Sequence, residues 1–166
     1  QFQHDVGHDN AILIHVTLIP YLRASGEMKT KPTQASVKEL QGMGIQPDVL
    51  VCRSEYPLTD DLRAKIALFC NVPVSHVLQN LDVEYLYEAP LAMEREKLAD
   101  VVMQSLGLEK RKPDLTDWEA MVENLRHPDK TVKIAMVGKY TQLHDAYLSV
   151  VEALKPGGIS CKAKVE

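Results

Sequence analysis

The chain has 166 residues and a formal net charge of −4, and 45% of its residues are hydrophobic. This composition is typical of a globular protein with one domain or two small ones. It argues against a general nucleic-acid-binding protein, which usually carries a basic surface, and no apolar run in the sequence approaches the roughly 18 residues of a membrane-spanning helix. The three cysteines lack CxxC spacing, so they indicate reduced thiols in a cytoplasmic protein and not a zinc site or a disulfide framework.

The first eighteen residues predict the end of a helix and then a strand. On a helix over residues 1–10, His4 and His8 would lie one turn apart, a spacing that suits a metal ion. No third ligand accompanies them, so we interpret the pair as surface histidines. Residues 11–18 (AILIHVTL) form a nearly continuous apolar run, which predicts a strand buried on both faces of a parallel sheet.

A basic loop follows that strand. Residues 23–38 hold four basic side chains and one acid, a local charge of +3. Pro32 disfavours the α conformation at Lys31, so we expect Lys29 and Lys31 to lie in extended backbone with both amines on the same side. Exposed lysine pairs are common on protein surfaces, but two ammonium groups just before a helix N-terminus also form a potential polyphosphate site.

The predicted helix after the loop begins at Thr33 or at Ser36. Ser36 would form a capping box with Glu39, and Gly44 is expected to end the helix. Ligands of open parallel sheets collect beyond the carboxyl ends of the strands. The basic loop therefore lies where a ligand is expected.

Two more units of strand and helix are predicted. Residues 48–52 favour a strand, and residues 61–71 favour a helix with Leu62, Ile66 and Phe69 toward the core. Three such units in a row predict an α/β fold, a parallel sheet flanked by helices.

The third unit combines a strand over residues 74–81 with one long helix over residues 84–106. Asp82 is a candidate N-cap for that helix. Gly107 is expected to end it.

Residues 109–130 are polar and hold two prolines, which favours an interdomain linker between bodies at residues 1–108 and 131–166. A helix over residues 116–125 is predicted inside this linker, with Thr116 and Glu119 as a capping box. Its apolar stripe is expected to contain Trp118, Met121, Val122 and Leu125. We interpret Trp118 as packing the linker onto a domain, with ligand stacking as the alternative.

The second body is predicted to start with a strand over residues 131–137. A helix over residues 145–154 is expected to follow it and to end at Lys155-Pro156-Gly157-Gly158. The pair Gly138-Lys139 after the strand is no P-loop, because the GxxxxGK[ST] frame is missing.

Several long motifs occur in the order typical of one enzyme family. They are residues 26–34 (GEMKTKPTQ), 36–40 (SVKEL), 44–48 (GIQPD), 52–54 (CRS), 63–70 (RAKIALFC) and 136–140 (MVGKY). With them the chain resembles, over nearly its whole length, CTP synthase, the glutamine-dependent ligase that aminates UTP to CTP. One departure is visible, because that family usually has histidine where Pro156 stands; a proline is expected to turn the chain sharply out of its helix.

The resemblance implies a set of nucleotide-binding residues. Those for the triphosphate of UTP and of the product CTP would be Lys29, Thr30, Lys31, Pro32, Thr33, Gln34 and Lys65. Those for the adenine of ATP, largely through backbone atoms, would be Leu81, Asp82 and Val83. Without the resemblance, Lys65 would be interpreted as an ordinary surface lysine.

The resemblance also implies a reaction. ATP phosphorylates the uracil carbonyl of UTP, and ammonia released from glutamine displaces the phosphate. The P-loop, the ligands of the Mg²⁺ that accompanies ATP, and the glutaminase nucleophile are expected outside this chain. We therefore expect no catalytic residue and no metal ligand here, and no activity of the chain alone.

The resemblance further implies the domain types and the partners. The first body would be the incomplete C-terminal part of a P-loop, dethiobiotin-synthetase-like synthetase domain, and the second the start of a class I glutaminase domain. UTP, CTP, ATP, glutamine and GTP are the ligands of the family, and its enzymes are cytoplasmic homotetramers with no expected nucleic-acid or membrane partner. The alternatives are a non-catalytic nucleotide-sensing or assembly module and, against the charge, a phosphate-loop protein for nucleic acid.

Overall fold

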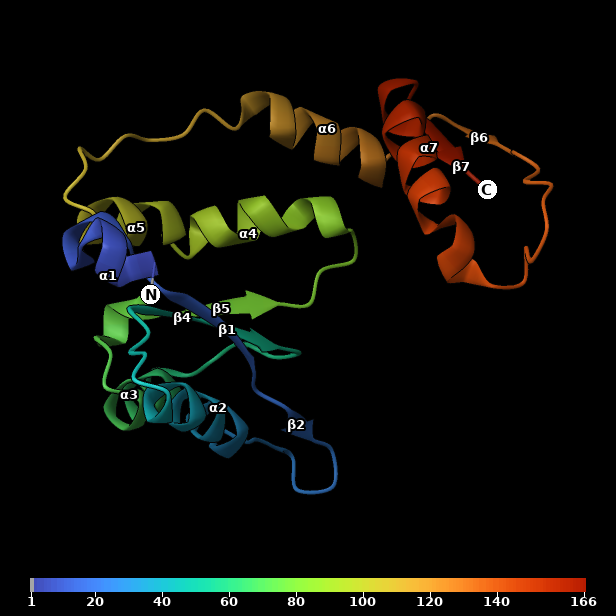
Figure 1. The fold of residues 1–166 in the computed structure, drawn as a ribbon. Helices are drawn as coiled ribbons and strands as arrows, with labels where there is room; N and C mark the ends of the chain where they lie inside the picture. The colour runs from blue at the N-terminus through green and yellow to red at the C-terminus, as the bar shows by residue number, and fades with distance from the viewer. Residues whose placement is uncertain (1) are drawn as a thin grey trace. The chain divides into compact units, whose positions relative to one another are not determined.

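The structure is a computed structural model that describes residues 2–166, apart from the side chain of His144 (Figure 1). Gln1, included in the predicted first helix, lies outside the described residues. The chain divides into two compact units, Gln1–Lys112 and Pro113–Glu166. Within the described part, no helix has both the length and the apolar character needed to cross a membrane.

A three-stranded parallel sheet of order β1-β4-β5 forms the centre of the first unit. Its strands are β1 (Ile14–Leu18), β4 (Val49–Ser54) and β5 (Val77–Leu81). In β4, every residue except Arg53 is buried, because this central strand is covered on both faces.

Helices cover the two faces of this sheet. Figure 1 shows α2 (Lys31–Gly42) and α3 (Asp60–Cys70) on one side of the strands, and α4 (Ala89–Arg95) and α5 (Leu98–Ser105) on the other. The larger core includes Ile19, Val37, Leu50, Cys52, Ile66, Cys70 and Val77. A smaller core contains Val49, Leu78 and Val101. These layers confirm the predicted α/β fold with a parallel sheet flanked by helices.

The prediction that β1 is buried on both faces is wrong. Val16 and Leu18 are 59% and 58% exposed, whereas Thr17 between them is buried. Side chains alternate between the two faces of a strand, so one face of β1 is covered and the other is open. An apolar run does not reveal whether both faces of its strand are covered.

The start of the chain and of α2 also differ from the predictions. The first helix, α1 (Phe2–Val6), stops before His8, which belongs to the 3-10 turn η1 (His8–Asn10), so His4 and His8 do not share a helix. The second, α2, begins at Lys31, with Pro32 in its first turn. Proline suits this position because its fixed φ is helical and its missing N–H would have no partner there. Lys31 is therefore helical and not extended.

Neither predicted cap of α2 is used. Thr30 occupies the N-cap position without a side-chain capping bond, and Thr33 and Ser36 lie inside the helix. Gly44, with φ at 79°, follows the end of the helix as predicted.

Helix α3 matches the predicted range but not the whole predicted face. Thr59 caps it by accepting a hydrogen bond from the Leu62 N–H at 3.3 Å. Ile66 is fully buried as predicted, whereas Phe69 is 60% exposed and Cys70 takes its place in the core. Residues four apart lie on the same side of a helix, so Ile66 pairs with Cys70 better than with Phe69.

The single helix predicted over residues 84–106 is broken into pieces. A 3-10 turn, η3 (Leu86–Glu88), leads into α4, and Glu96 and Lys97 separate α4 from α5. Lys97 has a φ of 61°, which no continuous α-helix contains. Gly107, also with positive φ, ends α5 as predicted.

The second unit contains α6 (Thr116–Arg126), β6 (Lys130–Val132), η4 (His144–Tyr147), α7 (Leu148–Ser160) and β7 (Ala163–Val165). β6 and β7 are parallel, and β6 is shorter than the predicted strand over residues 131–137. The predicted stripe of α6 is confirmed, since Val122 is buried and the other three residues are half-buried.

The capping box of α6 does not form. Instead, Asp114 Oδ1 accepts hydrogen bonds from the N–H and the hydroxyl of Thr116 at 3.1 and 2.7 Å. An aspartate two residues before a helix offers its carboxylate directly to a free N–H. These bonds also lower the pKa of the Asp114 carboxyl.

The expected end of α7 at Pro156 is wrong as well, because α7 continues through this residue to Ser160. Gly158 and Ile159 in its last turn are buried. A Cβ at Gly158 would lie 2.7 Å from the Ala163 carbonyl oxygen and 2.7 Å from Val165 Cγ2. The glycine therefore lets the end of α7 pack closely against β7, and this packing outweighs the local preference of the residue before proline.

Candidate functional site

The predicted site residues of the first unit lie beyond the carboxyl ends of its three strands. Backbone hydrogen bonds hold the strand exits together, because the Ile19 N–H donates to the Arg53 carbonyl at 2.8 Å and the Asp82 N–H donates to the Ser54 carbonyl at 3.2 Å. Loops after β1, β4 and β5 therefore start side by side. This edge is where open parallel sheets bind their ligands.

The basic loop folds as a hairpin. Its strands are β2 (Tyr21–Leu22) and β3 (Glu27–Met28), and Gly26 at the turn has a φ of 68°. Figure 1 shows the hairpin extending away from the end of β1 and returning to the start of α2. The Lys29 N–H donates to the Pro20 carbonyl at 2.9 Å, so the hairpin fixes the backbone of Lys29 at its base.

An aromatic contact ties this hairpin to the loop after β4. The rings of Tyr21 and Tyr56 have their centroids 4.4 Å apart and are tilted by 49°. The buried hydroxyl of Ser54 holds the second loop in turn, by donating to the Tyr56 carbonyl at 2.9 Å.

The two predicted threonines and Gln34 join α2 to the sheet. Thr30 and Thr33 are buried, and the Thr33 hydroxyl donates to the Leu18 carbonyl at 3.0 Å. The Thr17 hydroxyl donates to that of Thr33 at 3.2 Å, and the Gln34 amide donates to that of Thr30 at 3.0 Å. These polar groups therefore set the position of the helix N-terminus.

Two of the three lysines of the predicted site act on the same carboxylate, that of Glu27 in the hairpin. Lys29 forms an ion pair with Glu27, whereas Lys31 and Lys65 are exposed and make no ion pair with any other described residue. The Lys29 ammonium lowers the pKa of the Glu27 carboxyl, and the charge of Lys65, from α3, acts in the same direction. The charge of Lys65 on α3 therefore acts on the hairpin. Pro32, the remaining member of the predicted set, lies in the first turn of α2.

The residues predicted for adenine follow β5. Leu81 and Val83 are half-buried, and Asp82 lies at the surface between them. Arg53 Nη2 lies 3.4 Å from Asp82 Oδ1, but both side chains are 57% exposed, so the pair contributes little stability. The N-cap role of Asp82 is wrong, since the next helical turn starts only at Leu86.

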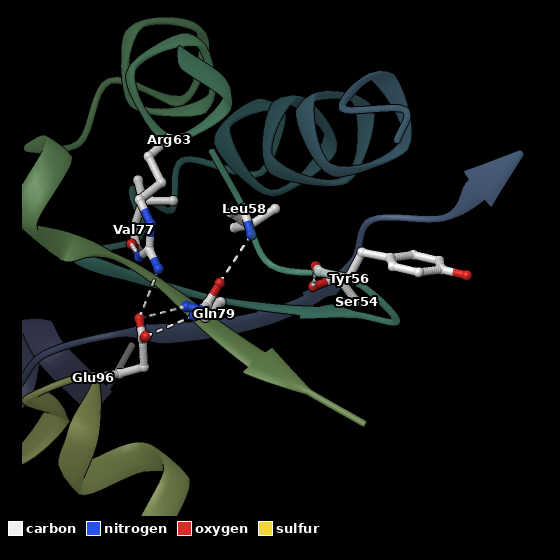
Figure 2. A network of polar contacts seen from close by, with 7 residues as sticks. All are labelled: Ser54, Tyr56, Leu58, Arg63, Val77, Gln79 and Glu96. Carbon is white, nitrogen blue, oxygen red and sulfur yellow. Dashed lines mark hydrogen bonds and ion pairs between the residues drawn. The ribbon is translucent and has the colours of Figure 1, made fainter. Parts of the chain in front are cut away.

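A network of polar contacts beside β5 was not predicted from the sequence (Figure 2). Arg63 on α3 and Glu96 at the helix break form an ion pair of 3.0 Å, and each side chain is only 18% exposed. Gln79 and the Leu58 N–H complete the network. The sequence did not indicate it because residues 84–106 fit the pattern of one continuous helix. Glu96 is an ordinary charged residue in that pattern, and nothing in it marks the break between α4 and α5.

The cysteines of this unit are not activated nucleophiles. Burial raises the pKa of the Cys52 thiol to about 12 and also raises the pKa of the Cys70 thiol. A reactive cysteine requires a thiolate near neutral pH. Over residues 2–166, no group of three or more His, Cys, Asp and Glu side chains is arranged to hold a metal ion.

Comparisons with known proteins agree on one family. The family described as "CTP synthase N-terminus" matches residues 1–108. The chain is 56% identical over 166 residues to CTP synthase of Ruminiclostridium cellulolyticum, and this covers 100% of the chain and 31% of that protein. It is 57% identical to CTP synthase of Symbiobacterium thermophilum, with 99% and 31% covered. It is also 53% identical over 160 residues to CTP synthase of Acaryochloris marina, with 96% and 29% covered.

The chain spans about a third of the length of these curated relatives. The family match covers the unit that carries the lysine hairpin, the parallel sheet and the loops beyond its carboxyl ends. The chain belongs to the CTP synthase family.

Proposed function

We propose that this chain is the part of a glutamine-dependent CTP synthase that recognises the triphosphate of UTP and of CTP. The observation that carries the proposal is the position of Lys29 at the base of the hairpin and of Lys31 at the first residue of α2, with the charge of Lys65 acting on Glu27 of the same hairpin. Lysines act as mobile point charges toward phosphate, and a helix N-terminus adds partial positive charge. The relatives named CTP synthase supply the identity of the nucleotides.

In this proposal the chain binds and orients, and does no bond-breaking step. Lys31 and Lys65 contact phosphate oxygens directly. Lys29 exchanges its Glu27 partner for phosphate, while the side chains of Thr30, Thr33 and Gln34 hold the helix start in place. Holding the triphosphate orients the uracil for reaction elsewhere in the complete enzyme.

The loop after β5 is proposed to receive the adenine of ATP. Leu81 and Val83 offer half-buried apolar surface, and the backbone around Asp82 is fixed to β4 through the Ser54 carbonyl. ATP would bring Mg²⁺, which neutralises phosphate charge. The described residues offer no cluster of ligands for that ion, so no step is assigned to it here.

The two units are proposed to belong to different functional domains. Residues 1–108 would form the end of the synthetase domain, residues 109–130 the linker, and residues 131–166 the start of a glutaminase domain. In the absence of an activated cysteine among the described residues and of a P-loop in the sequence, we expect the chain alone to form no CTP and to hydrolyse neither ATP nor glutamine.

The test is the steady-state kinetics of Lys31→Ala in the complete enzyme. A hydrogen bond to a charged group is worth roughly 1.5–3 kcal/mol, so losing one contact should raise the KM for UTP by about tenfold or more. CTP inhibition should weaken in parallel, because both nucleotides share the phosphate site, while glutamine hydrolysis should change much less.

Lys38→Ala is the matched control. Lys38 is exposed on the same helix, but two turns further on, about 10 Å along the axis. Equal effects of the two substitutions would indicate a general loss of positive charge and contradict the proposal. An enzyme that assembles normally but whose UTP and CTP responses are both untouched by Lys31→Ala would favour an assembly role for this segment.

A further inference from the structure

The break between α4 and α5 places a carboxylate against the outer strand of the sheet. Glu96 ends α4, and Lys97 takes the left-handed conformation that a non-glycine residue rarely adopts. Figure 2 shows the Glu96 side chain reaching toward Gln79 on β5 and toward Arg63 from α3.

Both oxygens of Glu96 accept hydrogen bonds. Oε2 accepts from Arg63 Nη2 at 3.0 Å and from the Gln79 N–H at 3.1 Å, and Oε1 accepts from Gln79 Nε2 at 2.9 Å. Arg63 Nη1 donates to the Val77 carbonyl at 2.7 Å. The charged pair therefore satisfies two backbone groups of β5, the Val77 carbonyl and the Gln79 N–H.

The same network holds the start of α3. The Leu58 N–H donates to Gln79 Oε1 at 2.9 Å, directly before the cap residue Thr59. Arg63, in the second turn of α3, makes the two bonds to β5 and Glu96. Two points of α3 are thus attached to β5, so both the position and the rotation of the helix are set.

Lys65 lies two residues beyond Arg63 on this helix. At about 100° per residue, the two side chains project from nearly opposite faces. Arg63 therefore faces the network while Lys65 is exposed, on a helix that lies on the same side of the sheet as α2 (Figure 1), and its charge acts on Glu27 of the hairpin. Lys65 makes no ion pair with another described residue, so the rotation of α3 sets the side from which its flexible side chain extends.

We propose that Glu96 is a positioning residue for nucleotide binding, which acts through Arg63 and α3 to hold Lys65 toward the triphosphate. This inference rests on the proposed function, in which Lys65 contacts phosphate. A buried ion pair adds little net stability over apolar packing, but it fixes one geometry. A lysine carried on a fixed helix loses less freedom on binding than one on a mobile helix.

The test is a double-mutant cycle in the complete enzyme, made of Glu96→Gln, Lys65→Ala and both together. The Glu96→Gln change would keep the shape of the side chain but lose the charge that Arg63 requires. We expect it to raise the KM for UTP by about fivefold, to weaken CTP inhibition equally and to leave glutamine hydrolysis unchanged. In the Lys65→Ala background the same substitution should have no further effect on the KM for UTP.

Two further variants complete the design. Arg63→Lys removes the forked geometry that reaches both Val77 and Glu96, and should reproduce the effect of Glu96→Gln. Glu109→Gln removes the carboxylate of an ion pair with Arg111 that is more than 80% exposed on both sides, and should change nothing. Thermal unfolding of every variant separates loss of stability from loss of binding.

Each other outcome has a definite meaning. An unchanged KM for UTP in Lys65→Ala overturns the proposed phosphate contact, and this inference with it. If Lys65→Ala raises the KM but Glu96→Gln multiplies it again in full, Glu96 acts independently of Lys65 and only the inference is overturned. Lower melting temperatures with an unchanged KM, or failure of both network variants to fold, would make the network purely structural and also overturn it.

Discussion

Removal of the Thr33 hydroxyl tests whether its hydrogen bonds hold the start of α2 against β1. Thr33 is fully buried, its hydroxyl donates to the Leu18 carbonyl at 3.0 Å, and it accepts from the Thr17 hydroxyl at 3.2 Å. Thr33→Val keeps the shape of the side chain and removes both bonds. A buried polar group that loses its partner costs about 1–3 kcal/mol, so the junction between β1 and α2 should open roughly 5- to 150-fold more often.

Amide hydrogen exchange of the complete enzyme measures this opening. Peptides that cover residues 14–42 should exchange faster by that factor in Thr33→Val, while Thr131→Val, at an exposed threonine of β6, should leave them unchanged. The KM for UTP should stay within about twofold, because the hydroxyl faces the sheet and only the position of the helix depends on it.

The opposite pattern would refute this reasoning. If the KM for UTP rose by about tenfold while exchange over residues 14–42 stayed as in the parent enzyme, the Thr33 hydroxyl would be a ligand contact. Its bonds to Leu18 and Thr17 would then describe only the ligand-free arrangement.

Cys52 should resist iodoacetamide at pH 8 while the exposed Cys161 reacts, as peptide mass spectrometry can show. Burial raises the pKa of Cys52 from 9.0 to about 12, so the unfolded chain loses its proton first. The free energy of unfolding in urea should therefore fall as the pH rises from 9 toward 12. Cys52→Ala should weaken this trend, and an undiminished trend in that variant would contradict the assignment. In α7, Gly158→Ala should lower the melting temperature, because the new Cβ would lie 2.7 Å from the Ala163 carbonyl oxygen. Gly157→Ala, with no atom within 4 Å, should be neutral or stabilising; equal effects would argue against the close packing of α7 on β7.

The sequence alone was sufficient for the features that depend on local chemistry. Apolar runs located all three strands of the sheet, and glycines at 44 and 107 ended their helices as predicted because only positive φ continues the chain there. The loop that contains Lys29 was placed at the carboxyl edge of a parallel sheet, since that edge follows from the order of strands and helices. The resemblance to CTP synthase needed only motifs in order, and the comparisons support it.

Only the tertiary structure decided features in which distant segments compete with local preference. Whether one or both faces of β1 are covered depends on the segments that pack against the sheet, and the apolar side chain of Val16 does not indicate which. Glu96, at the break between α4 and α5, bonds Arg63 and the strand β5, which are contacts between segments far apart in the sequence. Pro156 remains inside α7 because the next turn packs on β7. Local preferences amount to about 1–3 kcal/mol, and the burial of an apolar side chain in the folded protein is large enough to reverse them.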